Sequence, residues 1–179
     1  YFENTMNVWL QFGPGVSAVV APAVGPKSLP YNGVRLPRRT PGGFPDQFSM
    51  SARFLVRDDE EVVVTMKPCG ATYHAIQLGD YWFTSLQYVH RQSSLNGAQY
   101  RVSDGESVSV VISRSDPGVH NWLDTCGLHE GYFFVRWQGL PSAVEPPEPT
   151  IEVVRVGESQ SRGLGGGARR RHHAPPTCA

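Results

Sequence analysis

Short runs rich in β-branched and aromatic residues recur along the chain after residue 48. These residue types favour a pleated, half-buried surface, and no helical pattern separates one run from the next. The pattern predicts an all-β fold, an antiparallel β-sandwich, and the number of runs also fits a jelly-roll-like arrangement. The expected strands are residues 51–57, 61–67, 72–78, 81–88, 99–102, 107–113, 132–137 and 150–156.

Turn-forming residues separate several of these runs. Gly79-Asp80 lies between the third and fourth runs, and Asp104-Gly105 follows the fifth. Asp-Gly pairs are favoured in tight hairpins because glycine adopts a positive φ angle at no steric cost. A proline-rich connector, residues 140–149, precedes the last run, which we expect to return to the sheet as an edge strand.

The two ends of the chain differ in composition from this region. Prolines recur between residues 14 and 45, and each removes a backbone donor and fixes φ. We therefore expect residues 1–40 to be the remnant of an upstream region followed by a Pro-rich arm, and residues 41–156 to form the sandwich. Residues 157–179 are rich in Gly, Ser and Arg, and we expect them to be a disordered basic tail.

Composition narrows the class of protein. With 179 residues, of which 40% are hydrophobic and 11% aromatic, the chain fits one globular domain. A formal net charge of zero argues against a nucleic-acid partner. Three widely spaced cysteines favour reduced thiols and a cytoplasmic location. The sequence contains no apolar run of about 18 residues, so we expect no transmembrane segment.

Three motifs follow one another in the chain: Q-L-G-D-Y-W-F-T-S-L-Q-Y at residues 77–88, D-P-G-V-H-N-W-L-D-T at residues 116–125, and V-R-W at residues 135–137. Over roughly residues 41–156 they resemble the bacterial family catalogued as domain of unknown function 1214. The resemblance implies a jelly-roll-like domain at the C-terminus of larger, often two-part proteins, and it implies no agreed activity. Many relatives have proline and tyrosine where this chain has Asp124 and Gln138.

The segment from residue 113 to 131 carries the strongest candidates for ligand binding, because long loops on rigid sheets are where binding and catalysis concentrate. Trp122 could form a stacking platform, Asn121 a hydrogen-bonding group, and Asp124 or His129 an acid or base. The structural alternative is that Asn121 bonds the backbone of its own loop and that Trp122 closes the end of the sandwich.

Arg136 is a further candidate because it lies between Val135 and Trp137 in an apolar strand. A charge in such a place is costly unless it is paired. Asp116 or Asp124 would fix the long loop to the sheet by pairing with it. In the alternative, Arg136 lines a cleft and binds a ligand carboxylate bidentately.

Other chemistries find little support in the sequence. Its histidines and cysteines lack the H-x-x-x-H or C-x-x-C spacing that pre-organises a metal site, and no G-x-S-x-G nucleophile elbow is present. Cys126 has no local cation to lower its thiol pKa. We therefore expect no catalytic residue, no metal and no cofactor.

These observations leave three functional hypotheses open. The first is a β-sandwich that binds a small-molecule ligand or packs against its own upstream region or a second copy, because the runs 81–88 and 132–137 are apolar on both faces. The second is an enzyme with an interdomain active site, to which Asn121, Asp124, His129 and Arg136 would contribute. The third, a glycan-binding jelly roll, requires an exposed Trp or Tyr on a concave face.

Overall fold

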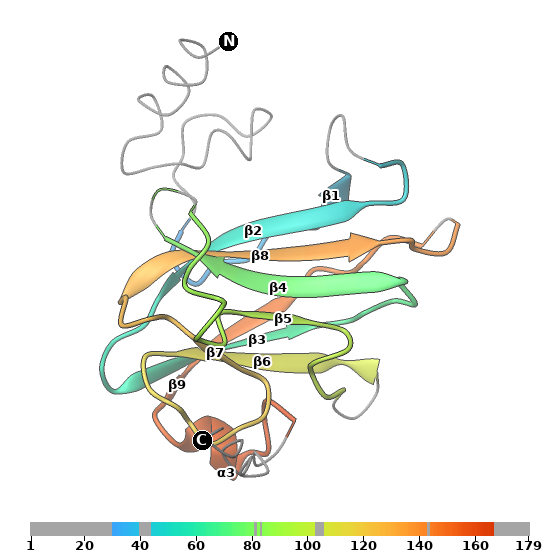
Figure 1. The fold of residues 1–179 in the computed structure, drawn as a ribbon. Coiled ribbons are helices and arrows are strands. Elements are labelled where there is room, and N and C mark those ends of the chain that lie inside the picture. The colour runs from blue at the N-terminus through green and yellow to red at the C-terminus, as the bar shows by residue number, and fades with distance from the viewer. Residues whose placement is uncertain are drawn as a thin grey trace, which may run out of the picture.

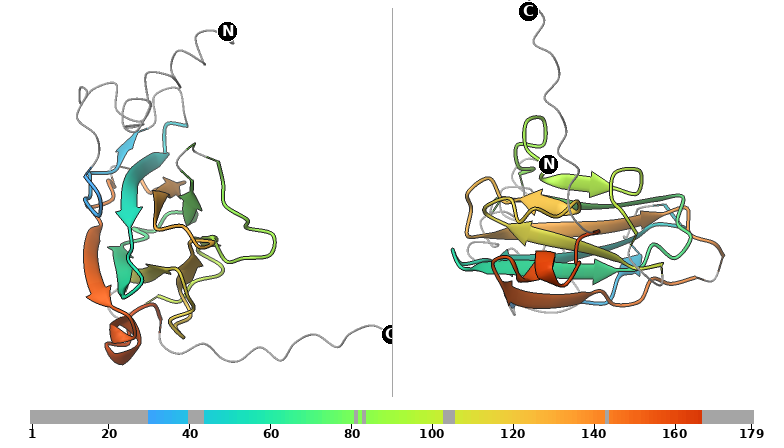
Figure 2. Two further views of the ribbon diagram at one scale, coloured as in Figure 1. Left: turned by 90° about the vertical axis from the view of Figure 1, so that its left-hand side faces the viewer. Right: turned by 90° about the horizontal axis from the view of Figure 1, so that it is seen from below.

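The computed structural model describes residues 30–39, 44–80, 82, 84–102, 106–142 and 144–166. Over these residues the chain forms a five-stranded and a four-stranded β-sheet that pack face to face (Figure 1). The two layers can be followed in the further views of Figure 2. The predicted all-β sandwich is confirmed. Among the residues described, no helix has the length and apolar character needed to cross a membrane.

The five-stranded sheet has the order β1-β2-β8-β4-β5, and every neighbouring pair in it is antiparallel. Its long central strand β8 pairs with β2 on one side and β4 on the other. The strands are β1 (Arg38–Arg39), β2 (Phe48–Leu55), β4 (Tyr73–Gly79), β5 (Ser94–Asn96) and β8 (Glu130–Gln138).

The four-stranded sheet has the order β7-β6-β3-β9. Its strands are β3 (Glu60–Met66), β6 (Val108–Ser113), β7 (Trp122–Asp124) and β9 (Thr150–Arg155). β7 runs parallel to β6, whereas the other pairs are antiparallel. β9 lies at the edge of the sheet, which confirms the expectation for the last strand.

The main core lies between the two sheets, and alternation along the strands fills it. In β8, Phe133, Val135 and Trp137 are buried in this core, whereas Phe134 and Arg136 point to the other face of the sheet. Each large apolar side chain that is fully buried contributes about 1.5–3 kcal/mol to folding. The period-two pattern of the sequence therefore sets which face of each strand is covered.

A second apolar cluster covers the outer face of the four-stranded sheet. It contains Val63, Val111, Val119 and Val154, against which Trp122 and Leu164 pack. The short helix α3 (Glu158–Ser161) follows β9 and leads the chain to Leu164. The predicted tail is therefore wrong for residues 157–166, because the cluster gives this segment apolar surface to bury. The rest of the expected tail, residues 167–179, lies outside the described residues.

Two of the expected strands are not strands. Residues 81–88 form a loop within the described positions, because Oδ1 of Asp80 accepts the N–H groups of Trp82 and Thr84 at 2.8 and 2.9 Å and turns the chain. Residues 99–102 also lie outside the strands. In their place the structure has β5 and β7, each three residues long.

The sandwich begins before residue 41. β1 pairs with β2, and Asn32 exchanges hydrogen bonds with the backbone of Leu55 at 2.8 and 2.9 Å. Part of the expected Pro-rich arm, residues 30–39, thus lies along β2. The remainder of the arm, residues 1–29, lies outside the described residues. The expected boundaries at 41 and 156 are therefore too narrow at both ends.

Candidate functional site

The structure gives the predicted ligand group Asn121 a structural role. Its side chain is fully buried. Its Oδ1 accepts the Arg101 N–H, and its Nδ2 donates to the carbonyl of Arg101 and, at 3.0 Å, to the carbonyl of Ser109. With these three bonds the amide has little remaining capacity for a ligand. The structural alternative therefore describes Asn121 better than the binding interpretation.

Trp122 and Asp124 lie on β7 and are also held by the chain. The indole N–H of Trp122 donates to the carbonyl of Ser113 at 3.3 Å, and its ring packs against the second apolar cluster. Asp124 accepts a hydrogen bond from Arg91 at 2.8 Å and from the backbone N–H of Cys126 at 2.7 Å. Arg91, and not Arg136, is thus the partner of the buried Asp124 carboxylate.

His129 and Arg136 lie apart from these residues and from each other. His129 donates from Nδ1 to the carbonyl of Val56 at 3.1 Å. Arg136 is exposed in the middle of the five-stranded sheet, and no Asp or Glu of the described residues pairs with it. The predicted pairing of Arg136 with Asp116 or Asp124 is wrong, because Arg136 points away from the long loop. The five candidates do not converge on one site.

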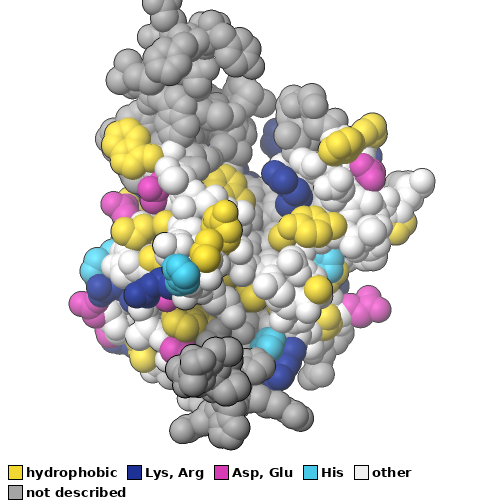
Figure 3. Space-filling view, in the orientation of Figure 1, with side chains coloured by type: hydrophobic (Ala, Val, Ile, Leu, Met, Phe, Trp, Pro, Cys, Tyr) yellow, Lys and Arg dark blue, Asp and Glu magenta, His cyan; other side chains and the backbone are white. Residues whose placement is uncertain are grey.

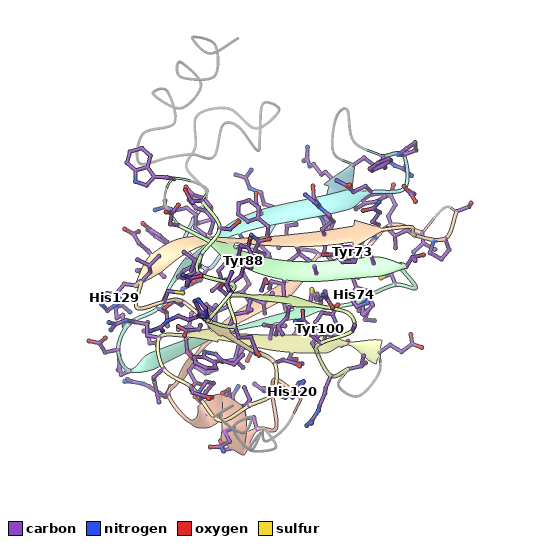
Figure 4. The ribbon with its side chains drawn as sticks, viewed as in Figure 1. Tyr73, His74, Tyr88, Tyr100, His120 and His129 are labelled. Atoms are coloured by element: carbon purple, nitrogen blue, oxygen red, sulfur yellow. The ribbon has the colours of Figure 1, made fainter. Side chains whose placement is uncertain are left out.

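A groove on the surface offers a better candidate, which we call the Tyr73 groove. It has a volume of about 500 Å³ and is lined by Thr72, Tyr73, His74, Asn96, Gly97 and Ala98. It lies where β5 ends beside the first residues of β4. Figure 4 shows Tyr73 on one side of β4, and His74 and Tyr100 on the other.

The groove exists because β5 is short. After Asn96 the chain turns, and Oδ1 of Asn96 accepts the N–H of Ala98 at 3.0 Å. The backbone N–H of Gly97 donates to the carbonyl of His74 at 2.9 Å, so the turn takes the place of a strand beside β4. A Cβ atom on Gly97 would lie 2.7 Å from the His74 ring, and only glycine allows this approach.

The long loop holds this turn in place from the other side. His120 donates from Nε2 to the carbonyl of Gln99 at 2.8 Å, and Asn121 fixes the backbone of Arg101 two residues later. The D-P-G-V-H-N-W-L segment therefore acts on the groove indirectly, as a support for the turn that forms one wall.

His74 supplies the buried end of the groove. Its ring lies 5.0 Å from the ring of Tyr100, centroid to centroid, and Nε2 is 3.5 Å from the Tyr100 hydroxyl. Burial lowers the pKa of His74, because the charged imidazolium loses water. Its Nδ1 is buried without a hydrogen-bond partner among the described residues. The imidazole is therefore neutral at pH 7.

The groove wall offers an aromatic ring and neutral hydrogen-bonding groups. Tyr73 is 47% exposed. The Asn96 side-chain amide nitrogen makes no hydrogen bond to the described residues. Within the described part of the chain, no group of three His, Cys, Asp or Glu side chains could hold a metal ion.

Sequence reasoning placed Tyr73 in an expected strand, 72–78, but did not connect it with a site. The signal available was alternation, which puts Tyr73 on the opposite face from Ile76 and Leu78 in the core. The end of β5, which creates the groove, has no comparable signal, because three residues are too few to show a period.

The comparisons with known proteins bear on the fold of this chain and do not give its function. No known family profile and no curated protein matches the sequence. The crystal structure of an uncharacterised protein from Burkholderia cenocepacia is similar with a TM-score of 0.65 and 24% identity, over 83% of this chain and 39% of that chain. The VPA0106 protein from Vibrio parahaemolyticus matches with a TM-score of 0.46 and 14% identity, over 59% of this chain and 30% of that chain. The chain thus spans about two fifths of the Burkholderia protein.

Proposed function

We propose that this chain is a saccharide-binding module and that the Tyr73 groove holds a sugar ring. The observation that carries the proposal is the half-exposed Tyr73 in a concave site beside the amide of Asn96. Of the three hypotheses that the sequence leaves open, the glycan-binding one requires this feature.

The chemistry of the groove suits a sugar. A pyranose has one face of C–H groups that packs against an aromatic ring, and hydroxyl groups around its rim that need donors and acceptors. Tyr73 offers the ring face, and Asn96, on the same face of the sheet, offers a polar amide without a fixed charge. A volume of about 500 Å³ falls within the range of small-molecule sites.

Binding fits the groove better than hydrolysis does. Most glycosidases use two carboxyl groups on either side of the scissile bond. Of the residues that line the groove, none is Asp or Glu. The enzyme alternative drew on Asn121, Asp124, His129 and Arg136, and in the described structure these residues do not come together.

The proposal also includes the family of the module and its place in a larger protein. On its three motifs we propose that the chain belongs to the family catalogued as domain of unknown function 1214, and that it forms the C-terminal part of a larger protein. The chain spans 39% of the Burkholderia protein, which supports its being a part of a larger protein.

A glycan array probed with the full 179-residue chain tests the proposal, followed by calorimetric titration of the glycans that it retains. We expect Tyr73→Ala to weaken binding at least about ten-fold, since loss of a stacked ring removes apolar contact area. Tyr88→Ala is the matched control, because Tyr88 is 63% exposed and lies outside the groove. An array without a retained glycan, or equal losses in the two variants, contradicts the proposal.

A further inference from the structure

Each strand of the five-stranded sheet contributes one residue to a row that crosses the sheet. The pairing places Arg38 opposite Ser49, Ser49 opposite Arg136, Arg136 opposite Ala75, and Ala75 opposite Asn96. Residues that are directly paired across strands point to the same face. The row therefore lies on one face, from β1 at one edge of the sheet to β5 at the other.

This face is the outer one, because Val135 and Trp137 on either side of Arg136 are buried in the core. The guanidinium of Arg136 is exposed there and makes no hydrogen bond or ion pair with the described residues. Its cross-strand neighbours, Ser49 and Ala75, have small side chains. An anion can therefore approach Arg136 from solvent without displacing a partner.

Further positive charge lies along the same side of the sheet. Neighbouring strands are about 4.8 Å apart, so Arg38, two strands from Arg136, is about 10 Å away along the row. Burial, and then repulsion by the positive charge of Arg38, lowers the pKa of Arg35. Figure 3 shows Lys and Arg side chains in the upper part of the view, and others at its left and lower parts.

The row meets the Tyr73 groove. Asn96 is both the last residue of the row and part of the groove wall. Tyr73 pairs with Gln138, two residues beyond Arg136 on β8, so Tyr73 and Arg136 are diagonal neighbours on the outer face. Such neighbours lie about 7–8 Å apart, within reach of long side chains. A sugar ring on Tyr73 would carry its substituents towards Arg136.

We propose that the saccharide bound in the Tyr73 groove is acidic and that Arg136 binds its carboxylate or sulfate group. This inference rests on the proposed function, and it adds the charge of the ligand. A planar guanidinium donates two parallel N–H groups to the oxygens of a carboxylate or a sulfate. Arg38 adds long-range attraction, which salt at physiological concentration partly screens.

The glycan array is extended with uronate-containing and sulfated glycans to test this inference. The best acidic ligand is then compared with its carboxyl-reduced or desulfated form, which keeps the sugar ring and loses the charge. We expect the acidic form to bind about three- to ten-fold more tightly, because one solvent-exposed charge-assisted contact is worth about 1 kcal/mol. Arg136→Gln removes this preference and retains binding of the neutral form. Arg57→Gln, which removes an equal charge from an exposed side chain in the β2–β3 turn, leaves the preference unchanged.

The outcomes separate the two proposals. Neutral glycans that bind as tightly as acidic ones, or a preference that survives Arg136→Gln, overturn the acidic ligand and leave the groove intact. Weakening of all binding by at least about ten-fold in Tyr73→Ala, together with loss of only the acidic preference in Arg136→Gln, supports both proposals. An array that retains no glycan at all overturns both. The ratio of carboxylated to sulfated glycans retained identifies the anionic group.

Discussion

The side-chain amide of Asn121 forms two hydrogen bonds with the backbone of Arg101. Its Oδ1 accepts the Arg101 N–H at 2.8 Å, and its Nδ2 donates to the Arg101 carbonyl at 2.7 Å. A carboxamide thus replaces a neighbouring strand for residue 101, which lies outside both sheets. Because this segment follows the turn at Gly97, the contact connects the long loop to the Tyr73 groove.

Substitution of Asn121 should therefore destabilise the fold. Asn121→Ala leaves buried backbone groups without partners, and each such group costs about 1–3 kcal/mol. We expect a loss in the free energy of unfolding of at least about 2 kcal/mol, measured by urea denaturation. Arg101→Ala is the control, because Asn121 bonds only the backbone of Arg101. The Arg101 side chain makes a long hydrogen bond to the Gly166 carbonyl at 3.5 Å, so its loss should cost about 1 kcal/mol or less. Equal losses in the two variants would show that the hydrogen bonds of Asn121 to the Arg101 backbone do not stabilise the fold.

Asp124 and His129, two of the residues predicted to bind a ligand, should differ in their effect on stability. Asp124→Ala removes the contacts to Arg91 and to the Cys126 N–H from a buried position, and we expect a loss of about 1–3 kcal/mol. His129→Ala removes one hydrogen bond from a half-exposed ring, and should cost about 1 kcal/mol or less. Denaturant midpoints measured side by side check the order, and the reverse order contradicts the structural role of Asp124.

The fold could be predicted from the sequence because alternation is a local property. β3, β6 and β8 each place apolar residues at every second position or more, and all three appear close to where they were expected. The segment 81–88 has equally strong β propensity. There the carboxylate of Asp80 caps two backbone N–H groups and forms a turn, which outweighs the propensity of the following aromatics.

The site could not be predicted because it depends on where strands end and which strands pair. The sequence marked Arg136 as unusual because it is a charge in an apolar strand. That its side chain lies exposed on the outer face, between β2 and β4, depends on how the strands pair. The approach of Gly97 to His74 joins residues that are 23 positions apart, without a sequence motif. We predicted a binding site in the polar loop because it contains Asn, Asp and His. These side chains bond to the backbone as readily as they bind ligands, so their presence alone does not identify a site.

The C-terminal segment should stabilise the sandwich. Both carboxylate oxygens of the buried Glu61 accept backbone N–H groups from this segment, at Gly157 and Ser159, over 2.9 and 3.3 Å. A chain that ends at residue 156 loses these bonds and exposes the second apolar cluster. We expect it to be less stable by about 3 kcal/mol and to bind a hydrophobic dye.

A chain that ends at residue 166 is the matched control, since it keeps α3 and Leu164. It should unfold within about 0.5 kcal/mol of the full-length chain. If the two shortened chains are equally stable, residues 157–166 do not contribute to the fold and the original expectation of a tail from residue 157 is restored.

His74 should make stability depend on pH in the acid range. Burial lowers its pKa in the folded state below the ordinary value of 6.5. The unfolded chain then binds a proton at His74 more readily than the folded chain does, so stability decreases as the pH falls through 6.5 and continues to decrease until the folded pKa is reached. Above that window the contribution of His74 is constant. We expect the melting temperature of His74→Gln to fall less steeply with acidification than that of the native chain. His90→Gln removes an exposed histidine of the 88–91 turn and should keep the native slope. A native slope in His74→Gln, or a flattened one in His90→Gln, would place the titration elsewhere and remove desolvation of the groove histidine as its cause.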